Sequence, residues 1–170
     1  METRQEQISI KTDVIKKVLI ALDYNSNSNE IAKIGHQLAK TIGAETVLIH
    51  IIADEYNYTA MQYNPIMGMG GFDYNVFTDV VDTKGFLDAG KYYLEHIKNN
   101  LEDETIQILV KIGDASTEVL TNAIEINADL IVIGTHSKPW LEKVLVGSVS
   151  ENILRDSKIP LLIIPTKNQN

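Results

Sequence analysis

Cysteine is absent from the 170-residue sequence, which also has only one tryptophan and four prolines. Without cysteine the chain can form no disulfide, zinc–thiolate centre, iron–sulfur cluster or thiol nucleophile. Long apolar runs are missing too: the longest has five residues, at positions 18–22, whereas a membrane-spanning helix needs about 20. Residues 1–13 mix charged and polar side chains and lack the apolar core of a secretory signal. These absences predict a cytoplasmic location.

Basic residues are scarce as well. The 15 lysines and arginines are outnumbered by 23 aspartates and glutamates, which gives a formal net charge of −8. A protein that binds duplex nucleic acid neutralises phosphates with clustered basic side chains, and the sequence has no such cluster. Neither nucleic acid nor a membrane is therefore expected as a partner. A small phosphate ligand remains compatible, because backbone amides at a helix start can hold it.

Apolar segments alternate with segments of helical periodicity. Five apolar segments predict β-strands, at residues 17–22, 46–52, 105–111, 129–133 and 160–164. Helical spacing of apolar residues predicts helices over residues 27–42, 84–101, 116–127 and 148–157. This alternation implies right-handed crossovers and an open, mostly parallel α/β sheet with helices on both faces. The first and fourth strands are apolar on both faces and are expected in the centre, whereas the third alternates with polar residues and is expected at an edge.

The first predicted helix carries the clearest local signals. Asn27 and Glu30 have capping-box spacing, and Gly43 follows the last turn as the expected C-cap. Apolar stripes are predicted at Ile31, Ile34, Leu38 and Ile42 in this helix, and the stripes of the next two helices include Phe86 and Ile124.

The chain is interpreted as one domain, residues 14–166, with tails at 1–13 and 167–170. Residues 54–82 form a long insertion after the second strand and contain four of the seven tyrosines and two of the three phenylalanines. An ordinary connection of this kind has about 2–6 residues. The insertion could be a lid over a ligand or a surface for a protein partner, but the preferred interpretation is a loop whose aromatic residues pack locally.

The last predicted strand is apolar throughout and has no later strand to cover it. Such an edge favours pairing with another chain, which predicts a homodimer through Leu161, Leu162, Ile163 and Ile164. Burial of the strand by the chain's own helices explains the same pattern equally well.

Asp23 and Gly134 follow the two central strands. Ligands of open parallel sheets bind beyond the carboxyl ends of the strands, where neighbouring crossovers run to opposite faces, so these two residues are expected to face each other across a crevice. The Asp23 carboxylate could accept hydrogen bonds from ribose hydroxyls or a base amino group, or it could cap the next helix, and its position alone leaves both open.

The start of the last helix is the second candidate. Ser148 and Glu151 have capping-box spacing, so the amides of Gly147, Ser148 and Val149 are expected to point into the crevice. The positive end of the helix dipole would favour an anion there. An ordinary capped helix would look the same in the sequence.

Several catalytic motifs are absent, namely GxGxxG, GxxxxGK[ST], HExxH and GxSxG. His36 and His50 lie within a helix and a strand and are interpreted as packing residues. His136 could contact a γ-phosphate, yet no partner that would make it a catalytic base is visible. No nucleophile–base pair is assigned.

Four segments resemble the universal stress protein family: VLIALD at residues 18–23, VLIHII at 47–52, ADLIVIGTHS at 128–137 and VGSVSENILRDSKIPLLIIP at 146–165. The resemblance covers residues 16–165, and the order of all the elements agrees. It implies a Rossmann-like sheet similar to that of the adenine-nucleotide alpha hydrolases, with strand order 3-2-1-4-5. It also implies dimerisation through the last strand and, in one subgroup, ATP binding.

The subgroup's motif is G-x2-G-x9-G-[ST], in which Gly134, Gly147 and Ser148 fill three of the four fixed positions. Ser137 replaces the second glycine. A serine there would resist a positive φ at a cost of about 1 kcal/mol, or its hydroxyl would donate to a phosphate. By resemblance, the nucleotide-binding residues are Asp23 at the nucleoside, Ile51 at the adenine, and Gly134, His136, Ser137, Gly147, Ser148 and Val149 at the ribose and phosphates.

The function implied by this resemblance is that of a small stress-response regulatory protein that binds ATP or AMP and at most hydrolyses ATP slowly. Whether Mg²⁺ binds together with the phosphates is left open, and no metal ligand is assigned. The alternative is a dimeric stress-response interaction module that binds no nucleotide, which Ser137 and the aromatic insertion would favour. An adenylating enzyme ranks last, because no catalytic signature is present.

Overall fold

The computed structural model describes residues 15–53, 83–136 and 148–166 of the chain. In chain order the elements are β1 Lys17–Leu22, α1 Ser28–Ile42, β2 Glu45–Ala53, α3 Thr83–Asn100, β3 Gln107–Gly113, α4 Ala115–Glu125, β4 Leu130–His136, α5 Ser148–Asp156 and β5 Leu161–Thr166. Each predicted strand and helix is present, with ends that differ from the prediction by at most three residues.

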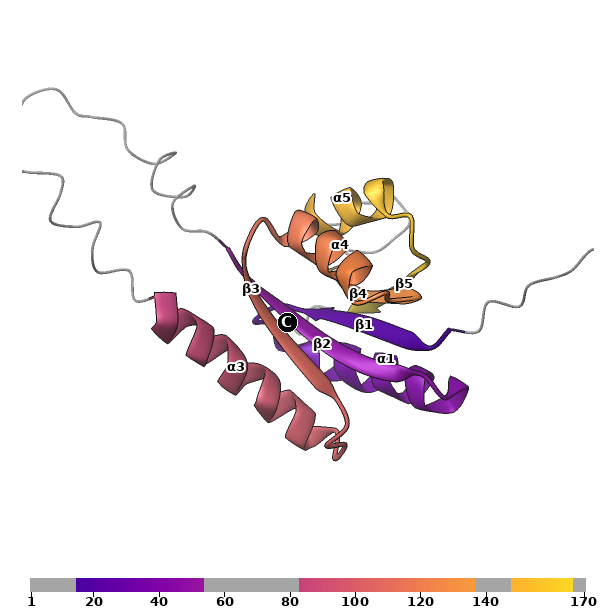
Figure 1. The fold of residues 1–170 in the computed structure, drawn as a ribbon, viewed down its shortest axis with the longest axis horizontal. Coiled ribbons are helices and arrows are strands. Elements are labelled where there is room, and N and C mark those ends of the chain that lie inside the picture. The colour runs from indigo at the N-terminus through magenta and orange to yellow at the C-terminus, as the bar shows by residue number, and fades with distance from the viewer. Residues whose placement is uncertain (1–14, 54–82, 137–147, 167–170) are drawn as a thin grey trace, which may run out of the picture.

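The five described strands form one parallel sheet in the order β3-β2-β1-β4-β5. Helices α1 and α3 cover one face, and α4 and α5 cover the other (Figure 1). The predicted parallel sheet, its strand order and the edge position of β3 are thus confirmed. β1 lies in the centre because its five consecutive apolar residues can be buried from both sides.

Alternate residues of β1 enter two separate cores. Val18, Ile20 and Leu22 pack with α1 and α3, whereas Leu19 packs with α4 and α5. This is the period-two alternation of a strand between two helical layers.

Helix α1 packs through small residues rather than through the predicted stripe. Ile34 and Ile42 are 39% and 38% exposed, so the prediction for these two positions is wrong. The buried side of the helix is formed by Ser28, Ile31, Ala32, Gly35, His36 and Ala39. At Gly35 a Cβ atom would lie 2.7 Å from Ile20 Cδ1, so the absence of a side chain lets the helix approach the sheet and sets which side it buries.

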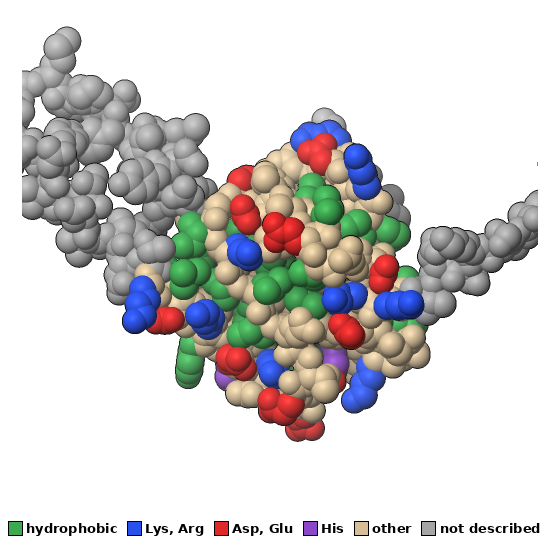
Figure 2. Space-filling view, in the orientation of Figure 1, with side chains coloured by type: hydrophobic (Ala, Val, Ile, Leu, Met, Phe, Trp, Pro, Cys, Tyr) green, Lys and Arg blue, Asp and Glu red, His purple; other side chains and the backbone are tan. Residues whose placement is uncertain are grey.

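Two further stripe positions were also wrong: Phe86 is 41% exposed and Ile124 is 65% exposed. On the face shown in Figure 2, lysines and arginines are dispersed among acidic residues. This agrees with the absence of a basic cluster from the sequence.

The helix caps differ from the prediction in one place. Gly43 adopts the expected left-handed conformation, with φ of 74°. Asn27, however, has helical backbone angles and makes no side-chain capping hydrogen bond. The side-chain cap is found at α4, where Asp114 Oδ1 accepts hydrogen bonds from the Thr117 amide at 2.8 Å and from the Ser116 and Thr117 hydroxyls at 2.7 Å.

Replacing Asp114 by alanine should lower the free energy of unfolding at pH 7 by about 1 kcal/mol, because the amide at the start of α4 loses its acceptor. Urea unfolding measures this, with Asp114→Asn as the matched control that keeps an acceptor oxygen. The Ser116 hydrogen bond, followed by those of Thr117, holds the Asp114 pKa below its ordinary value of 3.8.

The sign of the acid dependence follows from that lowered pKa. The carboxylate contributes its stability above pH 3.8 and loses it as the pH falls through the lower value in the folded state. Both variants should therefore lose less stability than the native chain on acidification. If acidification lowered the unfolding free energy of Asp114→Asn as much as that of the native chain, the stabilising role given to the Asp114 carboxylate would be wrong.

His36 is a packing residue, as predicted. It is 6% exposed, its Nδ1 atom lies 3.0 Å from Thr46 Oγ1, and its Nε2 atom lies 3.4 Å from Asp103 Oδ2. The imidazole joins α1 to β2 and to the connection before β3.

The tails and the insertion at 54–82 fall outside the described residues, so the proposed division of the chain and the role of the insertion stay predictions. Among the helices that the structure describes, none combines the length and the apolar character needed to cross a bilayer. The cytoplasmic location likewise stays a prediction.

Candidate functional site

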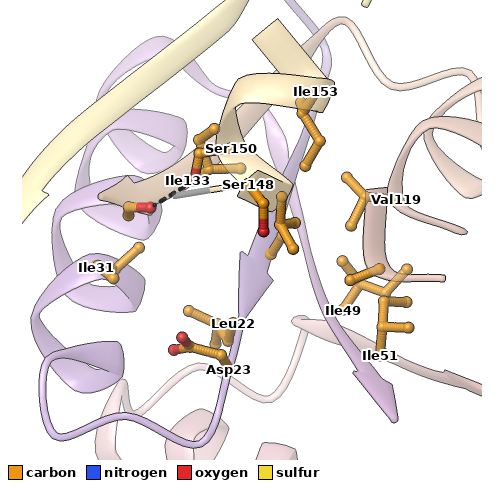
Figure 3. A pocket seen from close by; sticks show the side chains of 14 residues that line it. Leu22, Asp23, Ile31, Ile49, Ile51, Val119, Ile133, Ser148, Ser150 and Ile153 are labelled. Carbon is orange, nitrogen blue, oxygen red and sulfur yellow. Dashed lines mark hydrogen bonds between the residues drawn. The ribbon is translucent and has the colours of Figure 1, made fainter. Parts of the chain in front are cut away.

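A cavity of about 260 Å³ lies at the carboxyl ends of the central strands (Figure 3). It is lined by Ala21, Leu22, Asp23, Ile31, Ile49, Ile51, Ala115, Val119, Ile133, Gly134, Ser148, Val149, Ser150 and Ile153. β1 continues into α1 on one face of the sheet and β4 precedes α5 on the other, so the cavity occupies the position where open parallel sheets bind ligands.

Unequal strand pairing opens this cavity. β1 is paired with β2 as far as Leu22 and His50, but with β4 only as far as Ile20 and Val132. Beyond Ile20 the two central strands separate, and side chains from α1, α4 and α5 line the space between them.

The cavity has an apolar floor and a polar rim. Ile49, Val119, Ile133 and Ile153 are buried. Asp23, which directly follows β1, and Ser148, the first residue of α5, are exposed (Figure 3). A ligand suited to this lining has an apolar body and a polar or charged end.

Asp23 has contacts that bear on both roles that its sequence position left open, and neither role is excluded. The Ser28 hydroxyl, in the first residue of α1, donates to the Asp23 carbonyl at 2.6 Å and lies 3.1 Å from Oδ1. The residue therefore takes part in the turn that starts α1, and it also lines the cavity.

Gly134 has a packing role beside the cavity. A Cβ atom at this position would lie 2.1 Å from Ile31 Cδ1, so a larger residue would collide with α1. The Ser150 hydroxyl donates to the Gly134 carbonyl at 3.3 Å, which joins α5 to the end of β4. A side chain at this position would force Ile31 to move, so the glycine has a packing role that is independent of any ligand.

The first turn of α5 forms one side of the rim. The helix begins at Ser148, so Ser148 and Val149 lie within its first turn, and both are exposed. The capping box predicted at Ser148 is not tested, because Gly147 lies outside the described residues. α4 also contributes to the cavity, but Asp114 already occupies its N-terminus. The first turn of α5 lines the cavity as well, and the amides at the start of that helix favour an anion.

Next to Asp23, the side chains of Tyr24, His50 and Tyr93 form an aromatic cluster. The ring centroids are 4.3 Å apart for Tyr24 and His50, 4.6 Å for Tyr24 and Tyr93, and 5.2 Å for His50 and Tyr93. His50 Nδ1 lies 2.8 Å from the Leu22 carbonyl, to which it donates, and the Tyr93 hydroxyl donates to the Asp23 carbonyl. As predicted, His50 is a buried packing residue.

Burial raises the pKa of Tyr93. A hydrogen bond with Ser28 acts in the opposite direction, and the charges of Asp23 and Tyr24 reinforce the increase. The hydroxyl therefore keeps its proton at neutral pH and is available as a donor.

Of the residues singled out in the sequence, Asp23, Ile51, Gly134, Ser148 and Val149 all line the one cavity. His136 ends β4, and its side chain is not described. Ser137 and Gly147 lie outside the described residues, so their predicted roles stay predictions.

Sequence reasoning missed several residues of the cavity and of the turn at Asp23: Ser28, Ile31, Ile49, Tyr93, Ala115, Val119, Ser150 and Ile153. One of them had a usable signal, because Ile49 lies two residues before Ile51 on the same face of a strand. Within the described ranges no three histidine or acidic side chains gather into a possible metal site.

Comparison with known proteins gives a consistent result. The model of the universal stress protein family matches residues 15–165. Universal stress protein MJ0577 of Methanocaldococcus jannaschii is 31% identical over 157 residues, which span 90% of this chain and 96% of that protein.

Solved structures are similar in fold. The structure of MJ0577 has a TM-score of 0.62 at 22% identity and covers 92% of this chain and 99% of its own. A universal stress protein in complex with cAMP has a TM-score of 0.57 at 18% identity, over 89% of this chain and 97% of that one. A third, from Archaeoglobus fulgidus in complex with dAMP, has a TM-score of 0.51 at 16% identity, over 89% and 98%.

Proposed function

Because the chain belongs to the universal stress protein family, we propose that it binds an adenine nucleotide, ATP or AMP, between β1 and β4 and acts as a stress-response regulatory protein. One observation carries the proposal: Asp23 and the first turn of α5 line the same cavity, which has an apolar floor. The cAMP and dAMP complexes of two relatives support the choice of ligand.

The orientation of the nucleotide follows from the chemistry of the walls. The apolar side chains of Ile49, Ile51 and Val119 suit the adenine ring. The Asp23 carboxylate is an acceptor for ribose hydroxyls. The phosphates belong at Ser148 and Val149, since α5 offers its amides there.

The size of the cavity fits this arrangement. Its volume of about 260 Å³ is slightly below the range of about 300–1,000 Å³ for small-molecule sites, so it suits the nucleoside, with the phosphates on the rim. A Mg²⁺ ion bound with ATP would be held through the phosphates, because the described residues provide no cluster of metal ligands. No catalytic residue is assigned.

We also propose a homodimer through β5. This strand lies at the edge of the sheet, and Leu161, Leu162 and Ile163 are only half-buried. Ile164 is buried and contributes less to such a surface. The exposed Leu154 on the neighbouring helix α5 adds apolar area.

Native mass spectrometry of freshly purified protein tests both proposals at once. We expect the mass of two chains, together with added mass for AMP or ATP that chromatography identifies after denaturation. If no nucleotide is retained and calorimetry detects no binding at millimolar ATP, nucleotide binding is wrong and the alternative of a dimeric interaction module is favoured. A single-chain mass at micromolar concentration would contradict the dimer.

A further inference from the structure

We propose that Tyr93 is a positioning residue for the nucleotide site: its hydroxyl holds the end of β1 in the conformation in which Asp23 lines the cavity. The inference rests on the proposed function and assigns a role to α3, which lies on the face of the sheet opposite α5.

The end of β1 needs such support because the sheet provides little there. Pairing with β4 stops at Ile20, and pairing with β2 stops at Leu22. Asp23 is therefore the first residue past the sheet, and backbone groups there must find other partners.

One partner is local, because the Asn25 amide donates to the Asp23 carbonyl at 2.9 Å, and side chains from three different elements provide the others. His50 of β2 holds the Leu22 carbonyl. Ser28 of α1 and Tyr93 of α3 both donate to the Asp23 carbonyl, with the Ser28 oxygen at 2.6 Å. Two successive carbonyls are thus fixed from different directions, which restricts rotation of the backbone that carries the Asp23 carboxylate.

The aromatic cluster fixes the direction of the Tyr93 hydroxyl. Tyr93 is half-buried, and its ring contacts Tyr24 and His50 at centroid distances of 4.6 and 5.2 Å. A phenylalanine would preserve this packing and remove only the hydroxyl. Tyr93→Phe therefore separates the hydrogen bond from the contribution of the ring to the fold.

The matched control is the neighbouring tyrosine on the same helix. Tyr92 is 78% exposed, so Tyr92→Phe makes the same chemical change away from the turn. Calorimetry with AMP should show an affinity about three to ten times lower for Tyr93→Phe, the effect of one hydrogen bond, and an unchanged affinity for Tyr92→Phe.

A double-mutant cycle distinguishes positioning from a general structural role. If Tyr93 acts through Asp23, Tyr93→Phe should cause no further loss of AMP affinity in a chain that already carries Asp23→Ala. An equal loss in both backgrounds would overturn the proposal, as would an unchanged affinity in the native background.

Hydrogen exchange on the ligand-free protein gives an independent measurement. Tyr93→Phe should accelerate exchange of the amides of Tyr24 and Asn25, and Tyr92→Phe should not. If the native chain binds no AMP, the proposed function fails, while this experiment still decides the role of Tyr93. Unchanged exchange at both amides would overturn the inference on its own.

Discussion

Asp23→Ala lowers the affinity for AMP and ATP at least tenfold, about 1.4 kcal/mol, if the proposed site is correct. The reason is the loss of a charged acceptor for the ribose hydroxyls at the rim of the cavity, since hydrogen bonds to charged groups contribute about 1.5–3 kcal/mol. Titration calorimetry with each nucleotide measures the effect. Asp23→Asn, which keeps one acceptor oxygen, should lie between alanine and the native residue.

Glu45→Gln is the matched control for the change in charge. Glu45 begins β2 at the opposite end of the strands from Asp23, and its side chain is 63% exposed. The Glu45→Gln substitution removes the same single negative charge far from the cavity, so the affinity for AMP and ATP should not change. Equal losses in the two variants would show that only the net charge matters, and an unchanged affinity in Asp23→Ala would contradict the assignment of Asp23.

Ile153→Ala should have the largest effect on stability, a loss of about 2–5 kcal/mol of unfolding free energy. Ile153 is 1% exposed, and through this buried side chain α5 packs against both α4 and the sheet. The nine-residue helix has little intrinsic stability and depends on this contact. Urea unfolding followed by circular dichroism measures the loss.

Ile124→Ala on the neighbouring helix α4 is the matched control. Ile124 is 65% exposed, so its truncation should cost no more than about 0.5 kcal/mol. Because Ile153 lines the cavity, Ile153→Ala should also weaken AMP binding, whereas Ile124→Ala should not. Similar unfolding midpoints for the two variants would contradict the packing described for α5.

The sheet could be predicted from the sequence because its signals are local and strong. The uninterrupted apolar run of β1 and the polar alternation of β3 indicated the centre and the edge, and the resemblance supplied the strand order. The exposed side of α1 could not be predicted in this way. Its burial depends on how closely Gly35 lets the helix approach Ile20, a contact between residues on different elements.

The same distinction applies to the candidate site: residues with local signals could be predicted, and contacts between distant residues could not. Asp23 follows an apolar strand, and Ser148 opens a helix. The family resemblance assigned both residues to the nucleotide. Tyr93 could not be found, because it lies 70 positions from Asp23 in the sequence and its periodicity marks it only as an apolar stripe residue. Asp114 was missed as a cap because its helix was predicted to begin at residue 116, whereas α4 begins at Ala115.

The early end of pairing between β1 and β4 has a consequence for ligand entry. The two strands are not paired beyond Ile20 and Val132. The opening between them therefore begins where the backbone pairing ends, and no single lining side chain creates it. Substitutions along the walls can change which molecule fits while the hollow persists. For the proposed nucleotide, the wall side chains would then set the affinity, and the ends of the two strands would set where the opening lies.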